Sequence, residues 1–113
     1  VGIRCLDPHQ KAQAERYDVT ILGAHELDRI PPDLFDAPLY VTIDLDGLDP
    51  AFAPGVSHPE PGGLSTLDAL ALIRRIKGPL IGADVVELNP ERDPMLATAR
   101  VVVRLVKELA AAE

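Results

Sequence analysis

The sequence predicts an α/β chain built on a mainly parallel sheet in a three-layer α-β-α arrangement. Two apolar runs, residues 39–43 and 80–88, contain the β-branched residues that are typical of strands buried on both faces. Each run precedes a segment with apolar residues at helical spacing, and strands that alternate with helices form parallel sheets. A length of 113 residues suits one structural unit with a modest core.

The N-terminal part of the chain predicts two short strands and one helix. Residues 1–4 and 18–22 are short apolar segments that favour strands. Between them, Asp7 precedes a proline and is followed three residues later by a glutamine, which is typical of a capped helix start. We therefore predict a helix over residues 8–16. Residues 23–36 contain two adjacent prolines and predict only a short helical turn.

The remainder of the chain predicts a long loop, a second helix, a further strand and a third helix. Residues 49–63 are rich in prolines and glycines, which restrict the backbone and predict a loop of defined shape. Ser65, with an aspartate three residues later, predicts a capped helix over residues 66–76. A strand over residues 80–88 follows directly. Asp93 and the proline after it then predict the start of a long C-terminal helix.

Charge and composition limit the partners of this chain. A formal net charge of −7 argues against nucleic acid or an anionic membrane, and it is compatible with a small cationic substrate. No apolar run reaches the ~20 residues that cross a bilayer, and no signal-peptide pattern begins the sequence. The single cysteine, Cys5, has no internal partner for a disulfide, which suits a reducing compartment. We therefore expect a cytoplasmic protein.

Two aspartates, Asp44 and Asp46, end the first apolar run. Strand alternation would place both carboxylates on the same side of the pleat. Two ionised carboxylates this close are costly unless a cation lies between them, because each raises the pKa of the other. A divalent metal ion is the simplest explanation. Asp49 is better explained as a residue that organises the loop, because Asp-Pro turns commonly cap their own backbone.

The second apolar run contains two further acids, Asp84 and Glu87. Because the carboxyl ends of parallel strands open on one crevice, we expect Glu87 to lie near Asp44 and Asp46. Glu87 could cap the loop that follows it or hold a guanidinium through paired hydrogen bonds, and the local sequence favours neither. Asp84 brings a charge into an apolar strand, so it needs either a buried partner or a supporting role beside the site.

The motif DLDGLDP at residues 44–50 resembles the second metal-binding signature of the ureohydrolase family, which includes arginase, agmatinase and formimidoylglutamase. EPGGL at residues 60–64 and GADVVELNP at residues 82–90 are similar to further segments of that family. Residues 2–4 and 98–99 extend the similarity to nearly the whole chain. The resemblance implies the arginase-like α/β fold.

The same resemblance implies that Asp44 and Asp46 are ligands of a centre of two Mn²⁺ ions. It also implies that Glu87 is the catalytic residue that grips the substrate guanidinium. Metal coordination lowers the pKa of water toward neutrality, and attack of this water on the guanidinium carbon would release urea and an amine. The implied substrate is a small cationic guanidino compound, agmatine or arginine. A homo-oligomer is expected from the resemblance alone.

The chain departs from the family pattern in two places. Residues 55–59 read GVSHP, which is similar to the plant arginase-like branch that overlaps with agmatinases, so the choice between the two substrates stays open. His58 in this loop could contact substrate or face solvent. The family's histidine ligand and its Asp-Xaa-His-Xaa-Asp motif are absent from the sequence. We therefore expect residues 1–113 to be the C-terminal part of a roughly threefold longer domain, inactive alone.

Two other hypotheses remain. A strand that ends Asp-Xaa-Asp-Gly also begins Mg²⁺-dependent phosphohydrolases of the haloacid-dehalogenase type, in which the first aspartate, here Asp44, is the nucleophile. Leu48 stands where that family has a hydroxyl residue, and the proline- and glycine-rich loop has no counterpart there. A non-catalytic regulatory remnant is the third hypothesis, because most of the expected ligands are missing.

Overall fold

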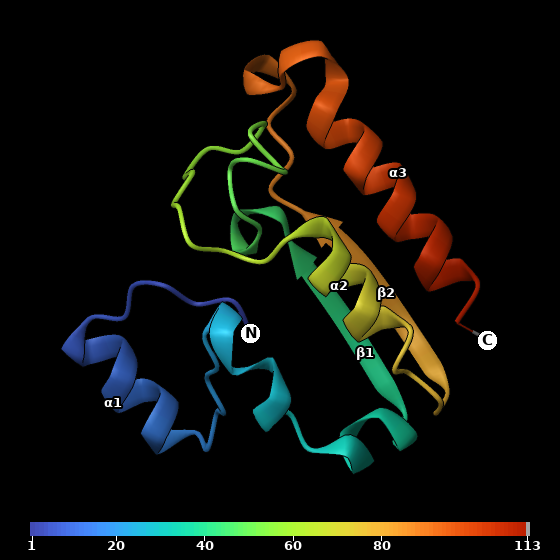
Figure 1. Ribbon diagram of the computed structural model, residues 1–113. Coiled ribbons are helices and arrows are strands. Elements are labelled where there is room, and N and C mark those ends of the chain that lie inside the picture. Colours follow the sequence, from blue (N-terminus) through green and yellow to red (C-terminus); the bar gives the residue numbers. More distant parts are fainter. Residues whose placement is uncertain (113) are drawn as a thin grey trace.

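Within residues 1–112 the sheet consists of two parallel strands (Figure 1). The computed structural model describes residues 1–112. Strand β1 (Leu39–Asp44) pairs with strand β2 (Leu80–Val86), and Asp44 lies opposite Val86 at their carboxyl ends. Both strands therefore end at the same edge of the sheet, as their parallel direction requires.

Two helices, α2 (Thr66–Ile73) and α3 (Ala97–Ala110), cover one face of the sheet (Figure 1). The opposite face of β1 is exposed in this chain, where the sequence predicted burial on both faces. The reason is that both helices pack on the same side of β1, the side to which every second β1 residue points. Together with the loop after β1, the helices enclose these side chains. The buried side chains of this main core are Leu45, Val56, Ala69, Leu70, Ile73, Leu105 and Leu109.

Helix α2 begins as the sequence predicts. The Ser65 hydroxyl accepts a hydrogen bond from the Asp68 N–H at 3.0 Å, and the Asp68 carboxylate accepts one from the Ser65 N–H at 2.9 Å. This reciprocal pair satisfies two N–H groups that the start of a helix leaves open. The helix ends at Ile73, earlier than predicted, and tighter turns lead to Gly78, whose N–H donates to the Phe35 carbonyl at 2.8 Å.

Helix α3 begins at Ala97, later than the sequence predicts from Asp93 and the proline after it. A short 3₁₀ turn over Pro94–Leu96 precedes it and contains two residues at positive φ, which interrupts the helical path. Asp93 nevertheless caps the helix across this turn. Its carboxylate accepts hydrogen bonds from the Thr98 N–H at 2.7 Å and the Ala99 N–H at 2.9 Å.

Helix α1 (Pro8–Arg16) has the predicted bounds and the predicted capping box. Asp7 accepts from the Gln10 N–H at 2.8 Å, and the Gln10 side chain accepts from the Asp7 N–H at 2.9 Å. Beyond it, short 3₁₀ segments cover Ala24–Arg29 and Pro32–Asp36. Across residues 1–112, every helix is too short or too polar to span a bilayer.

The two strands predicted in the N-terminal part are wrong. Residues 1–4 and 18–22 lie beside each other, but their backbones meet only where the Gly2 and Ile3 N–H groups donate to the Leu22 carbonyl, at 2.8 and 3.4 Å. An apolar cleft of about 890 Å³ lies between the N-terminal residues and β1, so residues 1–4 have no strand among residues 1–112 to pair with on that side. Apolar composition alone cannot form a strand without a ladder of hydrogen bonds.

A buried hydroxyl joins α3 to the long loop. Thr98 is fully buried, and its Oγ1 accepts a hydrogen bond from the Gly55 N–H at 2.7 Å. Thr98→Val keeps the shape of the side chain but leaves this N–H without a partner, which costs about 1–3 kcal/mol. We expect denaturant unfolding to show this loss for Thr98→Val and a smaller one for Thr98→Ser, which keeps the hydroxyl. Equal stability of the Thr98→Val variant and the parent chain would contradict this assignment.

Candidate functional site

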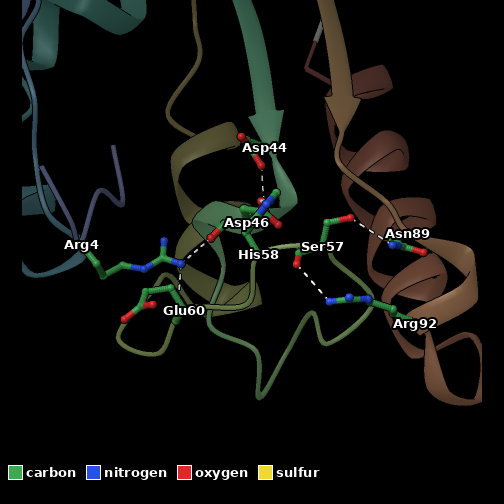
Figure 2. A network of polar contacts seen from close by, with 8 residues as sticks. All are labelled: Arg4, Asp44, Asp46, Ser57, His58, Glu60, Asn89 and Arg92. Atoms are coloured by element: carbon green, nitrogen blue, oxygen red, sulfur yellow. Dashed lines mark hydrogen bonds and ion pairs between the residues drawn. The ribbon is translucent and has the colours of Figure 1, made fainter. Parts of the chain in front are cut away.

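Strand β1 ends at Asp44, and the chain turns at once into a 3₁₀ turn over Leu45–Gly47. Oδ1 of Asp44 accepts a hydrogen bond from the Asp46 N–H at 2.8 Å, so the first acid caps the turn that contains the second (Figure 2). The prediction that strand alternation places both acids on one side of the pleat is wrong, because Asp46 lies outside the strand. The two residues are instead held together by this hydrogen bond between the Asp44 side chain and the Asp46 backbone.

Asp46 presents a carboxylate whose surroundings fit a bound cation. Its Oδ1 is buried and has no hydrogen-bond partner within residues 1–112, and its Oδ2 lies 3.6 Å from Nδ1 of His58. A buried carboxylate oxygen without a partner is costly, and a hard divalent cation is chemically suited to satisfy it. Carboxylate oxygens suit Mg²⁺, Ca²⁺ and Mn²⁺. The donor set therefore fits a metal ion of this class.

Three side chains meet at this edge of the sheet. Asp46, His58 and Glu87 each offer one ligand atom, and these atoms lie within 4.8 Å of one another. The parallel register predicted the proximity of Asp46 and Glu87, and the structure brings them together. Among the described residues Asp44 is outside this group, whereas His58 belongs to it with 84% of its side chain exposed. The geometry thus brings together Asp46, His58 and Glu87, whereas the pairing of Asp44 with Asp46 as metal ligands is the expectation from the sequence.

Glu87 follows β2 in an uncommon backbone conformation. Its φ is 69°, in the left-handed region that residues other than glycine seldom adopt, and its side chain is exposed. Such strain costs of order 1–3 kcal/mol and clusters at functional sites. The following loop is capped by Asn89, whose Oδ1 accepts a hydrogen bond from the Glu91 N–H at 3.1 Å. Asn89 therefore caps this loop, and capping was one of the two roles that the sequence left open for Glu87.

The turn after Glu87 holds the loop that contains His58 (Figure 2). Asn89 Nδ2 donates to Oγ of Ser57 at 3.0 Å, and the Arg92 guanidinium donates to the Ser57 carbonyl at 3.1 Å. The Asn89 N–H also donates to the Gly55 carbonyl at 2.8 Å. Sequence reasoning missed Asn89 and Ser57, because their partners lie 32 residues apart and no local pattern marks them.

Asp49 organises the long loop, which confirms the sequence prediction. Its Oδ1 accepts a hydrogen bond from the Ala51 N–H at 2.9 Å, and its Oδ2 accepts one from the Gly62 N–H at 2.7 Å. Gly62 has a φ of 86°, which glycine adopts without steric cost. The N–H groups of Ala51 and Gly62 hold the pKa of the Asp49 carboxyl below its ordinary value.

The lowered pKa of Asp49 predicts that this loop is sensitive to acid. The carboxylate stabilises the folded state above its unfolded pKa of about 3.9, and this stabilisation is lost as the pH falls further through the lower folded pKa. We expect Asp49→Asn to lower the melting temperature near neutral pH and to flatten its decline below about pH 4. Circular-dichroism melting curves across this range measure both effects. Parallel pH profiles for variant and parent would contradict the prediction.

Asp84 has a partner on the exposed face of the sheet. The Tyr40 hydroxyl donates a hydrogen bond to Oδ2 of Asp84 at 2.8 Å, and this bond raises the pKa of the tyrosine. The other oxygen, Oδ1, is buried without a hydrogen-bond partner in the described part of the chain. Asp84 therefore joins β1 to β2 on that face, and it is not a member of the group around Asp46.

Known proteins are similar to this chain over nearly its whole length. Residues 1–112 match the family model described as the arginase family. The chain is 44% identical to the mitochondrial arginase 1 of Arabidopsis thaliana over 119 aligned residues, which cover 98% of this chain and 35% of that protein. It is 51% identical to the guanidinopropionase of Pseudomonas aeruginosa over 73 residues, which cover 64% of this chain and 23% of that protein.

A solved structure gives the same result for the fold. Arginase from Medicago truncatula matches with a TM-score of 0.86 and 44% identity, over 98% of this chain and 38% of that chain. This match confirms the predicted α/β class with its parallel sheet and the predicted arginase-like fold. The phosphohydrolase hypothesis receives no support from these relatives. The chain spans only 35% of the length of the plant arginase that it resembles in sequence.

Proposed function

Because the chain belongs to the arginase family, we propose that it forms the C-terminal part of a manganese-dependent ureohydrolase, which converts a guanidino substrate to urea and an amine. One observation carries this proposal: the buried Oδ1 of Asp46, which has no hydrogen-bond partner within residues 1–112, belongs to a carboxylate that lies beside the exposed carboxylate of Glu87. A metal ion suits the first carboxylate, and a substrate cation suits the second.

We assign Asp44 and Asp46 to a pair of Mn²⁺ ions. When bound, the ions supply a water whose pKa lies near neutrality. Asp44 fixes the turn through its Oδ1, and Asp46 offers one buried oxygen and one oxygen beside His58. The family's Asp-Xaa-His-Xaa-Asp motif is absent from this sequence, so the other ligands must come from residues outside it. We therefore expect the chain alone to be inactive.

Glu87 is the catalytic residue of this proposal. Its carboxylate can hold a planar guanidinium through two charge-assisted hydrogen bonds, which orients the guanidinium carbon for attack. We propose that His58 contacts the same guanidinium, because its imidazole lies in the group that Glu87 and Asp46 form. The His58 side chain is 84% exposed, so its imidazole is accessible to a ligand in solution.

The proposed substrate is arginine or agmatine, both small cations that suit a chain with a net charge of −7. Relatives are named for action on arginine, guanidinopropionate and guanidinobutyrate, so a guanidino group is what their substrates share. We propose a cytoplasmic homo-oligomer, although the plant relatives are named as mitochondrial.

The experiment for this function is urea release by the complete enzyme that contains this chain. Arginine, agmatine, guanidinopropionate and guanidinobutyrate would be supplied in turn after loading with Mn²⁺. We expect urea from at least one of them, with activity lost on chelation and restored by Mn²⁺. A folded, metal-loaded enzyme that releases urea from none of the four would contradict the proposal. Release of phosphate from a phosphomonoester would favour the phosphohydrolase hypothesis instead.

A further inference from the structure

Arg4 links its own N-terminal segment to two distant backbone segments near the site, those of Asp46 and Glu60 (Figure 2). Its guanidinium donates hydrogen bonds to the carbonyls of Gly2 at 2.7 Å, Asp46 at 2.5 Å and Glu60 at 2.8 Å. The two distant acceptors lie 42 and 56 residues along the chain. One of them belongs to the turn after β1, and the other belongs to the loop that contains His58.

The Asp46 residue is held through both of its backbone polar groups. Its N–H donates to Oδ1 of Asp44, and its carbonyl accepts from Arg4. These two bonds fix the backbone from which the partly buried Asp46 carboxylate projects. A carboxylate fixed in this way meets a metal ion with little rearrangement, which favours affinity.

The loop around His58 is also held on both sides. Ser57 is bound by Asn89 and Arg92 on one side, and the Glu60 carbonyl is bound by Arg4 on the other. His58 itself is 84% exposed, so its own packing does not determine its position. The contacts of its neighbours therefore set where the imidazole lies relative to Asp46 and Glu87.

The contacts of Arg4 are unusual for an arginine beside several acids. None of the ion pairs within residues 1–112 includes Arg4, and its Nε is buried without a hydrogen-bond partner. All the hydrogen bonds of its guanidinium go to backbone carbonyls. The planar fork of five N–H donors can serve three carbonyls in fixed directions, whereas a lysine ammonium is a single point with three donors.

We propose that Arg4 is a positioning residue that couples the metal-ligand turn to the substrate loop. Through the Asp46 carbonyl it sets the affinity for Mn²⁺, and through the Glu60 carbonyl it sets the position of His58 and hence the KM for guanidino substrates. This proposal rests on the proposed function for its consequences in metal and substrate binding. The coupling of the two segments is independent of that function.

Arg4→Ala and Arg4→Lys test the proposal in the complete enzyme, with Arg100→Ala, an exposed arginine of α3, as the matched control. Titration calorimetry measures Mn²⁺ affinity, steady-state kinetics separates KM from kcat, and hydrogen exchange follows the backbone N–H groups of residues 45–47 and of the non-proline residues in 58–63. We expect Arg4→Ala to weaken Mn²⁺ binding by about 10–100-fold, to raise KM, and to speed exchange in both segments. The Mn²⁺ affinity, KM and exchange rates of Arg4→Lys should lie between those of Arg4→Ala and those of the parent enzyme.

Unchanged Mn²⁺ affinity and KM in the Arg4 variants would overturn the proposal, even if the melting temperature fell, because a purely structural arginine would produce that pattern. If Arg4→Ala does not fold, the comparison of Arg4→Lys with Arg100→Ala decides the question. A parent enzyme that neither binds Mn²⁺ nor releases urea would refute the proposed function. The exchange measurement would still decide whether Arg4 couples the two segments.

Discussion

Replacement of Glu87 by glutamine should lower the turnover of guanidino substrates by about 100-fold or more, because loss of orientation at a reacting centre has effects of this size. Glutamine has nearly the same shape, but it cannot form the charge-assisted pair that a carboxylate forms with a guanidinium. Glu87 is exposed and its strained backbone would be unchanged, so we expect the fold and the manganese content to remain. Steady-state kinetics measures the turnover, and metal analysis on the same preparation measures the manganese content.

Glu91→Gln is the matched control for this variant. Glu91 is an exposed glutamate in the turn just after Glu87, and it lies outside the group around Asp46. The Glu91→Gln variant should turn over substrate at the rate of the parent enzyme. Near-normal turnover in Glu87→Gln, together with a lowered melting temperature, would return Glu87 to a structural role and remove it from the substrate site.

Replacement of Asp46 by asparagine should remove manganese and activity together. Asparagine keeps the size of the side chain and one oxygen, but it loses the negative charge through which the carboxylate attracts a divalent ion. Because the buried Oδ1 of Asp46 has no partner in residues 1–112, the fold loses little hydrogen bonding through this change. We expect Mn²⁺ affinity to fall by at least about 100-fold, beyond the loss typical of residues that only support a ligand.

Asp44→Asn tests the second assigned ligand, and Asp28→Asn, an exposed aspartate far along the chain from the site, serves as the control. Loss of metal in the Asp44 and Asp46 variants but not in the Asp28 variant is the expected pattern. If Asp44→Asn keeps both metal ions and full activity, Asp44 acts only through the hydrogen bond that it accepts from the Asp46 N–H.

Features encoded in a few neighbouring residues could be predicted from the sequence. The capping pairs that start α1 and α2 are complete within four residues, and both form as predicted. The strands β1 and β2 could be predicted because their apolar runs are continuous and lie between clear turn signals. Their parallel direction then placed the carboxylates of Asp46 and Glu87 at one edge of the sheet.

Features that depend on distant residues could not be predicted. Residues 1–4 and 18–22 have apolar composition suited to strands, but a strand also needs a pairing partner, which no local pattern specifies. Alternation predicted the side of Asp46, but the strand ends at Asp44 and Asp46 lies in the 3₁₀ turn that follows. The contacts of Arg4 join segments more than 40 residues apart, so only the folded chain reveals them.

Anomalous diffraction from crystals of the complete enzyme, grown with Mn²⁺ and soaked with a guanidinium inhibitor, tests the assigned metal ligands most directly. Two ligand sets compete at this edge of the sheet, since Asp46 is near both Asp44 and the pair of His58 and Glu87. We expect manganese peaks at the carboxylates of Asp44 and Asp46, with the guanidinium group against Glu87. A manganese peak coordinated by His58 and Glu87, with Asp44 uncoordinated, would contradict this assignment.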